Sequence, residues 1–309
     1  MRTAIVGGTG SIGMALAACL AQRGMEVVVL SRRAPAMLPE CAAWRPADVT
    51  DYRSLRATLA GSKVERLVHL AALLQFACEA DPAEAARVNV EGTANVLDAS
   101  RDVGIRRVVF GSSIAVYGER SDPMRETDEL PVEVGCYGVT KQLAESFGER
   151  FRQRHGLEFV SLRYSGVFGP GEAASAGMAQ VRSRILSCAR GEDVRIEGAC
   201  GDERVHLTHV SDAAEATCAA LLAPSLPPRA VYNVAGPPEN YVSLRELHAL
   251  VRELVPGAGR AIWSSRVARS AGPVDISRIA RDLGWRPAVS LRDGLRELLV
   301  PRSRRASVA

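Results

Sequence analysis

Tyr137 and Lys141 lie four residues apart in the stretch CYGVTKQLAE, and their types and spacing point to proton chemistry. Residues at i and i+4 share one face of a helix, so the two side chains would be neighbours. A tyrosine hydroxyl has a pKa near 10 in water, and a cation beside it lowers that pKa because it stabilises the phenolate. The spacing predicts that Tyr137 exchanges a proton with a substrate while Lys141 lowers its pKa.

Lysine is scarce elsewhere in the chain, which makes the position of Lys141 informative. Of the 39 Lys and Arg residues, only Lys63 and Lys141 are lysines. Arginine is a poor substitute where a compact ammonium must fit, because its guanidinium is a wide planar fork. A solvent-facing lysine is the ordinary alternative, but it leaves unexplained why one of two lysines stands one turn after a tyrosine.

Ser112 and Ser113 follow an apolar run in RRVVFGSSIAVYG. Parallel α/β folds bind ligands at the carboxyl ends of their strands, so a hydroxyl there could orient the substrate oxygen that reacts with Tyr137. Serines at a strand end are otherwise common polar residues that begin a loop. The Tyr–Lys pair favours the functional interpretation, and both serines are candidate substrate-binding residues.

A glycine-rich loop, IVGGTGSIG, places Gly7, Gly10 and Gly13 between an apolar run and a helical pattern. Glycine brings backbone N–H groups close to a pyrophosphate, which the following helix N-terminus also attracts. Many such loops are plain turns, but a strand before and a helix after favour dinucleotide binding. We expect this loop, with Ser11 and Ile12, to bind the cofactor.

The second apolar run ends in LSRR, at Ser31, Arg32 and Arg33. NAD-binding versions of such folds use an acidic residue about 20 positions after the loop to bond the ribose hydroxyls. With no carboxylate there and two guanidiniums able to bind a 2′-phosphate, the sequence favours NADP(H) and leaves NAD(H) possible. Both arginines could instead be solvated ends of a turn.

Short apolar runs alternate with segments of helical spacing over the first 165 residues. The runs are TAIVGG, EVVVL, RLVHLAA, RRVVFGSS and EFVSLRY, and helices are expected at 11–23, 81–103 and 137–156. This alternation predicts an α/β fold, a doubly wound parallel sheet with helices on both faces.

After residue 165 the pattern loosens. The stretch GVFGPGEAASAGMA is typical of a mobile loop over a site, and a helix near 177–190 and a strand–helix pair at 204–223 follow it. We expect residues 1–165, with 204–235 returning to them, to form a dinucleotide-binding domain. Residues 166–203 and 236–309 would form a smaller C-terminal substrate-binding cap.

Composition excludes several classes of protein. A net charge of +4 over 309 residues, without a basic stripe, does not favour nucleic acid, and no apolar run approaches a membrane span. Seven scattered cysteines without metal-ligand spacing predict reduced thiols, a cytoplasmic location and no metal site. We expect a homodimer that binds a small-molecule substrate.

The motifs G-x-x-G-x-x-G, S-S-x-x-V-Y-G and Y-x-x-x-K resemble, in order and spacing, the extended short-chain dehydrogenase/reductase family. That family includes NAD(P)-dependent sugar-nucleotide epimerases and dehydratases. The resemblance covers most of the chain, because HLAA (69–72), LRYSGVFGP (162–170), RVHLTHVSDAAEA, YNVAG and DISRIARDLGWRPAVSLRDGL match its other blocks. It implies a Rossmann-type fold and an NAD(P)-dependent enzyme.

The resemblance also implies roles for single residues. Tyr137 would be the acid/base, Lys141 would also bind the cofactor ribose, and Ser113 would hold the reacting oxygen. Asn89 joins these catalytic residues as one that helps to position the site. Further cofactor contacts are implied at Asp48, Val49, Leu70, Ala71, Ala72, Tyr164, Gly166 and Val167.

On the substrate side, Arg204 matches an arginine that binds the diphosphate of a nucleotide sugar, with Arg266 or Arg269 as a possible second contact. Leu73 would line the substrate site. The stretch Leu73–Phe76 is apolar and resembles family members that oxidise small hydroxy or amino acids.

Two further departures from the family pattern narrow the chemistry. Dehydratases carry an Asp–Glu pair after the catalytic hydroxyl residue, whereas Ile114 and Ala115 follow Ser113 here, so dehydration is rejected. Sugar-nucleotide members commonly have Asn in R-Y-F-N, where this chain has Gly166. A donor and acceptor for the standard substrate pose is therefore missing.

Three hypotheses for function remain. The first is an NAD(P)-dependent epimerase or ketoreductase/dehydrogenase that acts by hydride transfer on a secondary alcohol or ketone, above all in a nucleotide sugar. The second is a dehydrogenase or reductase of a small hydroxy or keto compound. The third, a catalytically silent NADP-binding sensor, is disfavoured because a sensor needs no activated phenol.

Overall fold

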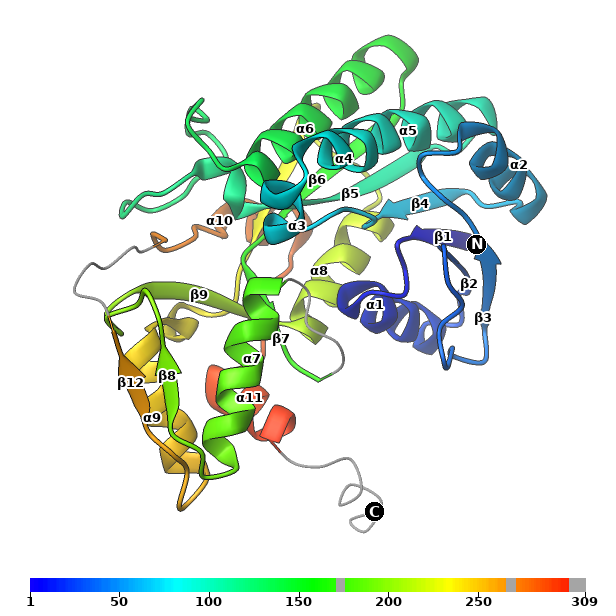
Figure 1. Cartoon of the computed structure of the whole chain (residues 1–309). Coiled ribbons are helices and arrows are strands. Elements are labelled where there is room, and N and C mark those ends of the chain that lie inside the picture. The colour runs from blue at the N-terminus through cyan, green and yellow to red at the C-terminus, as the bar shows by residue number, and fades with distance from the viewer. Residues whose placement is uncertain (171–175, 265–270, 300–309) are drawn as a thin grey trace.

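A central sheet of seven parallel strands organises the computed structural model, which describes residues 1–170, 176–264 and 271–299 (Figure 1). The strand order is β10-β6-β5-β4-β1-β2-β3. The strands are β1 (Arg2–Val6), β2 (Glu26–Ser31), β3 (Ala42–Pro46), β4 (Arg66–His69), β5 (Arg107–Ser113), β6 (Glu158–Tyr164) and β10 (Ala230–Val234). The predicted doubly wound α/β fold is confirmed.

Helices cover both faces of this sheet because alternate strand residues point to opposite sides. In β2, Val27 and Val29 enter one apolar core, and Val28 and Leu30 enter the other. The first core packs under α1 (Ser11–Gln22) and α8 (Val210–Leu222). The second packs under α2 (Tyr52–Ser62), α5 (Gly92–Asp102) and α6 (Cys136–His155).

The helix expected at 81–103 begins and ends where its signals lie. Asp81 accepts a hydrogen bond from the Glu84 N–H at the start, and Gly104 with a φ of 78° follows the end. The run consists of α4 (Pro82–Ala85), a π-helical segment (Ala86–Glu91) and α5. π-Helical segments are rare and often occur at functional sites, and this one contains Asn89.

A smaller lobe lies below the large sheet in Figure 1 and has its own apolar core, which includes Phe168, Ile185, Leu207, Leu247 and Leu295. Its strands form two small sheets, in the orders β11-β9-β7 and β12-β8. The strands are β7 (Gly166–Phe168), β8 (Val194–Ile196), β9 (Arg204–His209), β11 (Tyr241–Ser243) and β12 (Ala261–Trp263). The helices are α7 (Ala176–Ala189), α9 (Leu244–Leu254) and α11 (Leu291–Leu299).

The boundaries of the two lobes differ from the expected ones at β9. Residues 210–235 do return to the large sheet, as α8 and β10, and α10 (Ser277–Leu283) packs beside β10. Strand β9, however, pairs with β7 and β11 of the smaller lobe. The expected mobile loop contains β7 at its start, and its residues 171–175 lie outside the described residues.

The described residues contain neither a candidate membrane span nor a candidate metal cluster. No helix among them is long and apolar enough to cross a membrane. Within the same ranges, no group of three or more His, Cys, Asp or Glu side chains is arranged to hold a metal ion.

Candidate functional site

Tyr137 and Lys141 lie on the first turns of α6, beside the carboxyl end of β5. Lys141 is 3% exposed, and its Nζ donates a hydrogen bond of 2.7 Å to the Gly111 carbonyl oxygen. Its Nζ also lies 5.5 Å from the centre of the Tyr137 ring. Burial of the ammonium lowers the pKa of Lys141 to about 8. The helix therefore holds both side chains against the end of one strand.

The environment of Tyr137 changes its pKa in the direction opposite to the sequence prediction. Burial raises the pKa of the phenol above its usual value of 10, with a smaller contribution from Cys78, and a hydrogen bond with Ser113 opposes the rise. Lys141 directs its ammonium to the Gly111 carbonyl. Burial thus raises the pKa of Tyr137, whereas the sequence predicted that Lys141 would lower it.

Ser112 and Ser113 have different surroundings, as neighbours on a strand must. Ser113 hydrogen-bonds to Tyr137 through its side chain and accepts a bond of 3.1 Å from the Ala115 N–H. Ser112 is 3% exposed and donates a bond of 2.5 Å to Glu145 Oε1. Ser113 therefore belongs to the Tyr137 site, and Ser112, predicted to bind substrate, instead joins β5 to α6.

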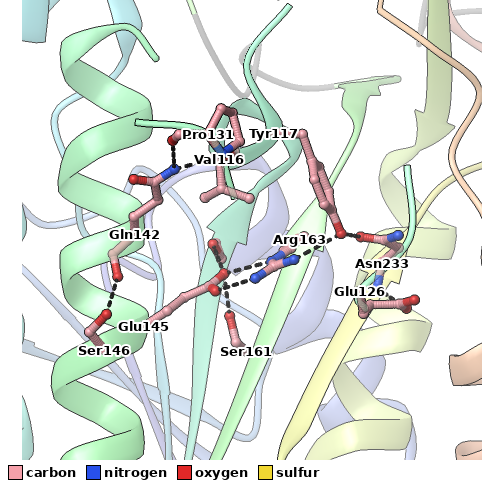
Figure 2. A network of polar contacts seen from close by, with 11 residues as sticks. Val116, Tyr117, Glu126, Pro131, Gln142, Glu145, Ser146, Ser161, Arg163 and Asn233 are labelled. Carbon is pink, nitrogen blue, oxygen red and sulfur yellow. Dashed lines mark hydrogen bonds and ion pairs between the residues drawn. The ribbon is translucent and has the colours of Figure 1, made fainter. Parts of the chain in front are cut away.

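A buried polar network lies behind this site (Figure 2). Glu145 accepts bonds of 3.0 and 2.6 Å from the Arg163 guanidinium on β6, and Arg163 also donates to the Tyr117 hydroxyl at 2.9 Å. Tyr117, at the end of a 3₁₀ turn (Ile114–Tyr117), donates to Asn233 Oδ1 on β10 at 2.8 Å. The network links α6, β5, β6 and β10.

Sequence reasoning missed the four residues of this network. Glu145 stands four residues after Lys141, the same spacing as between Tyr137 and Lys141, which was the one local signal. The others lie inside quoted blocks, namely Tyr117 in S-S-x-x-V-Y-G, Arg163 in LRYSGVFGP and Asn233 in YNVAG. Their pairing is long-range, so no local pattern reveals it.

Asn89 connects two segments of the chain that surround the site. Its side chain is buried and exchanges hydrogen bonds with both backbone groups of Leu73, accepting at 2.7 Å and donating at 3.0 Å. It also donates to Thr140 Oγ1 on α6 at 3.0 Å. Asn89 thus joins the segment after β4 to α6, and the geometry supports the positioning role rather than contact with a reacting group.

The segment after β4 meets the glycine-rich loop. The N–H groups of Leu70 and Ala71 both donate to the Val6 carbonyl. Gly7 has a φ of +78°, and a Cβ there would lie 2.4 Å from the Ala71 nitrogen, so only glycine fits. Ala72 and Leu73 continue this segment towards α3 (Gln75–Ala80).

The loop suits a dinucleotide pyrophosphate. A Cβ at Gly13 would lie 2.5 Å from Gly8 Cα, so helix α1 packs tightly on the loop. Gly10, at the start of α1, makes no side-chain cap, and the first turn, which includes Ser11 and Ile12, carries no acidic residue. N–H groups at such a helix start attract an anion. The residues present therefore fit the phosphates of the predicted cofactor.

Strand β2 ends at Ser31, and Arg32 and Arg33 follow it at the same edge of the sheet. Ser31 Oγ accepts a bond of 3.0 Å from Trp44 Nε1 and donates to the Arg33 carbonyl at 2.6 Å. Both arginines are exposed. Burial acts against ionisation of the nearby Asp48, but bonds from Thr50 and the charge of Arg32 hold the pKa of its carboxyl below the usual value.

The other residues predicted to contact the cofactor lie in the core or in strand β7. Val49 is buried against Gly92 of α5. Tyr164 is 6% exposed, and its hydroxyl lies 2.7 Å from Thr217 Oγ1 on α8, so its side chain points into the core instead of the cleft. Gly166 and Val167 form β7, which pairs with β9.

Arg204 lies in the smaller lobe and contacts residues of that lobe. Its guanidinium donates a bond of 2.8 Å to the Tyr241 carbonyl, lies 4.7 Å above the centre of the Tyr241 ring, and is 3.5 Å from Glu246. None of these partners belongs to the Tyr137 site. Arg266 and Arg269 lie outside the described residues.

Two cavities flank these groups. A small apolar one lies between Ser11 of the glycine-rich loop and the smaller lobe, with Val167, Phe168, Met178 and Leu207 in its wall. A larger cavity of about 450 Å³ lies beside α6, where Glu145, Phe159 and Ser161 form part of its mixed polar and apolar lining. The first opens beside the cofactor loop, and the second reaches the buried network from behind.

Comparison with known proteins agrees with this geometry. The sequence profile of the NAD dependent epimerase/dehydratase family matches residues 3–235. The chain belongs to the NAD-dependent epimerase/dehydratase family. The predicted resemblance to extended short-chain dehydrogenases/reductases is thereby confirmed.

Relatives in the epimerase/dehydratase family include both epimerases and dehydrogenases. UDP-glucose 4-epimerase of Lacticaseibacillus casei is 28% identical over 93% of this chain and 92% of its own. Mitochondrial L-threonine 3-dehydrogenase of Bos taurus is 33% identical over 72% of this chain, but the match spans only 61% of that enzyme. A solved structure of MoeE5 in complex with UDP-glucose and NAD has a TM-score of 0.85 and 28% identity, with both chains fully covered.

Proposed function

We propose that this protein is an NAD(P)-dependent epimerase or dehydrogenase that transfers a hydride at a secondary alcohol or ketone. The observation that carries this proposal is the meeting of Ser113, Tyr137 and Lys141 at the carboxyl end of β5. The nicotinamide cofactor, when bound, accepts or supplies the hydride. Ser113 and Tyr137 orient the reacting oxygen, and Tyr137 gives or takes its proton.

A nucleotide sugar is the leading substrate class. The L. casei UDP-glucose 4-epimerase and the MoeE5 structure match nearly the whole chain, including the smaller lobe. We assign substrate binding to that lobe, whose Arg204 would bind a diphosphate. Ile114 and Ala115 open a 3₁₀ turn after Ser113 and carry no carboxylate, so the proposed reaction excludes dehydration.

A small hydroxy or amino acid is the second candidate. The apolar Leu73 and Leu74 precede α3 in the segment that Asn89 joins to α6, and the bovine threonine dehydrogenase is 33% identical over its matched part. In both cases the same Tyr137 and Ser113 act on a secondary alcohol, so only the substrate lobe distinguishes the two. An intact set of Ser113, Tyr137 and Lys141 argues against a silent sensor.

The test combines cofactor retention with turnover. Mass spectrometry of the undenatured protein as purified shows whether a nicotinamide dinucleotide stays bound, which an epimerase needs throughout its cycle. Turnover of UDP-glucose and UDP-glucuronic acid is then compared with turnover of L-threonine. Conversion of a UDP-sugar to its C4 epimer supports the leading class, and cofactor reduction by threonine supports the second. No turnover of either, with cofactor bound, would favour the silent sensor.

Cofactor preference is proposed to lie with NADP(H). Support comes from the exposed Arg32 and Arg33 after Ser31, because their guanidiniums can bind a 2′-phosphate. The MoeE5 structure contains NAD, so the preference would be a property of this chain. Titration of intrinsic fluorescence with NADPH and NADH measures it, and equal affinities would contradict it.

A homodimer in the cytoplasm completes the proposal. Val139, Leu143 and Phe147 form an apolar stripe on α6 and are 37%, 45% and 40% exposed, as a surface that pairs with a second copy would be. All seven cysteines are free thiols, which suits a reducing compartment. Light scattering of the purified protein, with Leu143→Glu as the variant expected to be monomeric, tests the dimer.

A further inference from the structure

Three consecutive residues at the end of β5 contact three residues on one face of α6. The Gly111 carbonyl accepts a bond from Lys141, the Ser112 hydroxyl donates to Glu145, and Ser113 bonds to Tyr137. Tyr137, Lys141 and Glu145 are spaced four residues apart, so they form a single stripe along the helix. Two of the three contacts involve the proposed catalytic residues, and the third belongs to a residue without an assigned role.

Of the three contacts, the one at Glu145 includes an ion pair. Arg163 and Glu145 form a two-pronged ion pair, with side chains that are 1% and 9% exposed. Besides Ser112, Ser161 on β6 donates to the same carboxylate oxygen at 2.9 Å. Figure 2 shows Glu145 reaching from α6 to β6 at this point. One carboxylate therefore fixes the helix to two adjacent strands of the sheet.

We propose that Glu145 is a positioning residue for the reaction: it fixes the α6 face that carries Tyr137 and Lys141 against the end of β5. The inference rests on the proposed function, because it assigns Glu145 to the same hydride-transfer site. Glu145 does not touch the reacting groups. It acts through the placement and the charge state of Lys141.

The charges around Lys141 explain why the carboxylate matters beyond packing. Four titratable groups face the Lys141 ammonium. They are His69 on β4, Cys78 on α3, and Tyr137 and Glu145 on α6. Burial lowers the pKa of His69 to about 3, so that imidazole is neutral. Burial lowers the pKa of Lys141, and Cys78 and then Glu145 oppose that effect by raising it. Glu145 therefore favours the protonated form of the Lys141 side chain.

The test is Glu145→Gln in the full-length protein, which retains the shape and loses the charge. The expected result is a fall in kcat of about 10-fold or more, because small displacements of catalytic groups are costly. The alkaline limb of the pH–rate profile should move to lower pH, since Lys141 then loses its proton more readily. Glu149→Gln is the matched control, because Glu149 lies one turn further along α6 in a half-exposed pair with Arg152.

A direct measurement of Lys141 needs no substrate. The chain has only two lysines, so selective ¹³Cε labelling of lysine gives two signals, and Lys63→Arg assigns them. The signal of Lys141 should titrate near pH 8 in the unmodified protein and at lower pH in Glu145→Gln. An unchanged titration together with unchanged kcat would overturn the proposal. Failure of the proposed function would look different, as an unmodified protein without turnover.

The double variant Glu145→Gln/Arg163→Gln keeps the test decisive if the single variant unfolds. A lone buried arginine is strongly destabilising, whereas removing both charges often is not. A purely structural role predicts that restored stability also restores kcat and the alkaline limb. The proposal predicts that kcat and the titration of Lys141 stay altered in a folded double variant. Recovery of both to the values of the unmodified protein would refute it.

Discussion

The edge of the large lobe that carries Tyr137 and the smaller lobe around Arg204 hold their polar groups differently. At the edge of β5 and α6, hydrogen bonds between neighbouring elements fix each group, as Lys141 to Gly111 and Glu145 to Arg163 show. In the smaller lobe, Arg204 is held by Tyr241 and Glu246 of its own lobe, and the cavity beside the glycine-rich loop is apolar.

This difference distinguishes the groups proposed to transfer the proton from the group proposed to bind the substrate. The proton-transfer groups hold one arrangement without help from a ligand, because each has a protein partner. A diphosphate would have to draw Arg204 away from contacts that it already makes. In the proposed function, the large lobe sets the type of chemistry, and the smaller lobe sets which molecule undergoes it.

Tyr137→Phe is expected to have the largest effect and tests the catalytic side of this comparison. Loss of the hydroxyl should lower kcat by about 10²-fold or more, the usual contribution of a general acid or base. Affinity for the cofactor should stay nearly unchanged, because the ring remains. Steady-state kinetics and cofactor titration measure the two quantities.

Tyr164→Phe is the matched control for this change. It removes a hydroxyl that is buried against Thr217, so it should cost about 1 kcal/mol of unfolding free energy and leave kcat near normal. A Tyr137→Phe variant that keeps full turnover would show that another group carries the proton.

The second prediction concerns the stability of the same region at high pH. Lys141 has a pKa of about 8 when folded and 10.5 in the unfolded chain, so between these values the unfolded state holds more protons. Its contribution to the free energy of unfolding therefore rises with pH across that window, by about 3 kcal/mol. Urea unfolding from pH 7 to 10 should show this rise relative to Lys141→Met, and parallel curves for the two proteins would contradict it.

Arg204→Ala tests the substrate side. UDP-glucose at about 100 times its Kd should add about 2.7 kcal/mol to the stability of the cofactor-loaded protein, and Arg204→Ala should lose most of that gain. Arg195→Ala, at an exposed position of the same lobe, is the control. Retention of the full gain in thermal-shift measurements would leave Arg204 as an internal contact of its lobe and favour a small substrate.

Local patterns predicted the fold and the Tyr137 side of the site because both depend on short-range regularities. Continuous apolar runs indicated parallel strands, Asp81 and Gly104 bounded the helical run between them, and the i, i+4 spacing put Tyr137 beside Lys141. The family match covers the same region and continues to residue 235.

Sequence reasoning misplaced residues whose role depends on the direction of the side chain or on contacts between distant parts of the chain. Ser112 and Tyr164 were assigned to ligands, but the buried Ser112 hydroxyl bonds to Glu145 on α6, and the Tyr164 hydroxyl bonds to Thr217 on α8. The pairing of Glu145 with Arg163 joins residues 18 positions apart through the packing of α6 on β6. The pKa of Tyr137 is raised because its phenol is buried, which sequence does not reveal, and the Lys141 ammonium bonds to the Gly111 carbonyl.

Glu145 forms part of the lining of the cavity beside α6, so solvent can approach it from a side that Tyr137 does not line. In a Glu145→Ala protein, a small carboxylate such as formate could enter by this route and take the place of the missing group beside Arg163. Chemical complementation of this kind would restore turnover in proportion to formate concentration while the substrate side remains undisturbed. Formate that binds beside Arg163 would then activate the Glu145→Ala enzyme through a cavity separate from the substrate side.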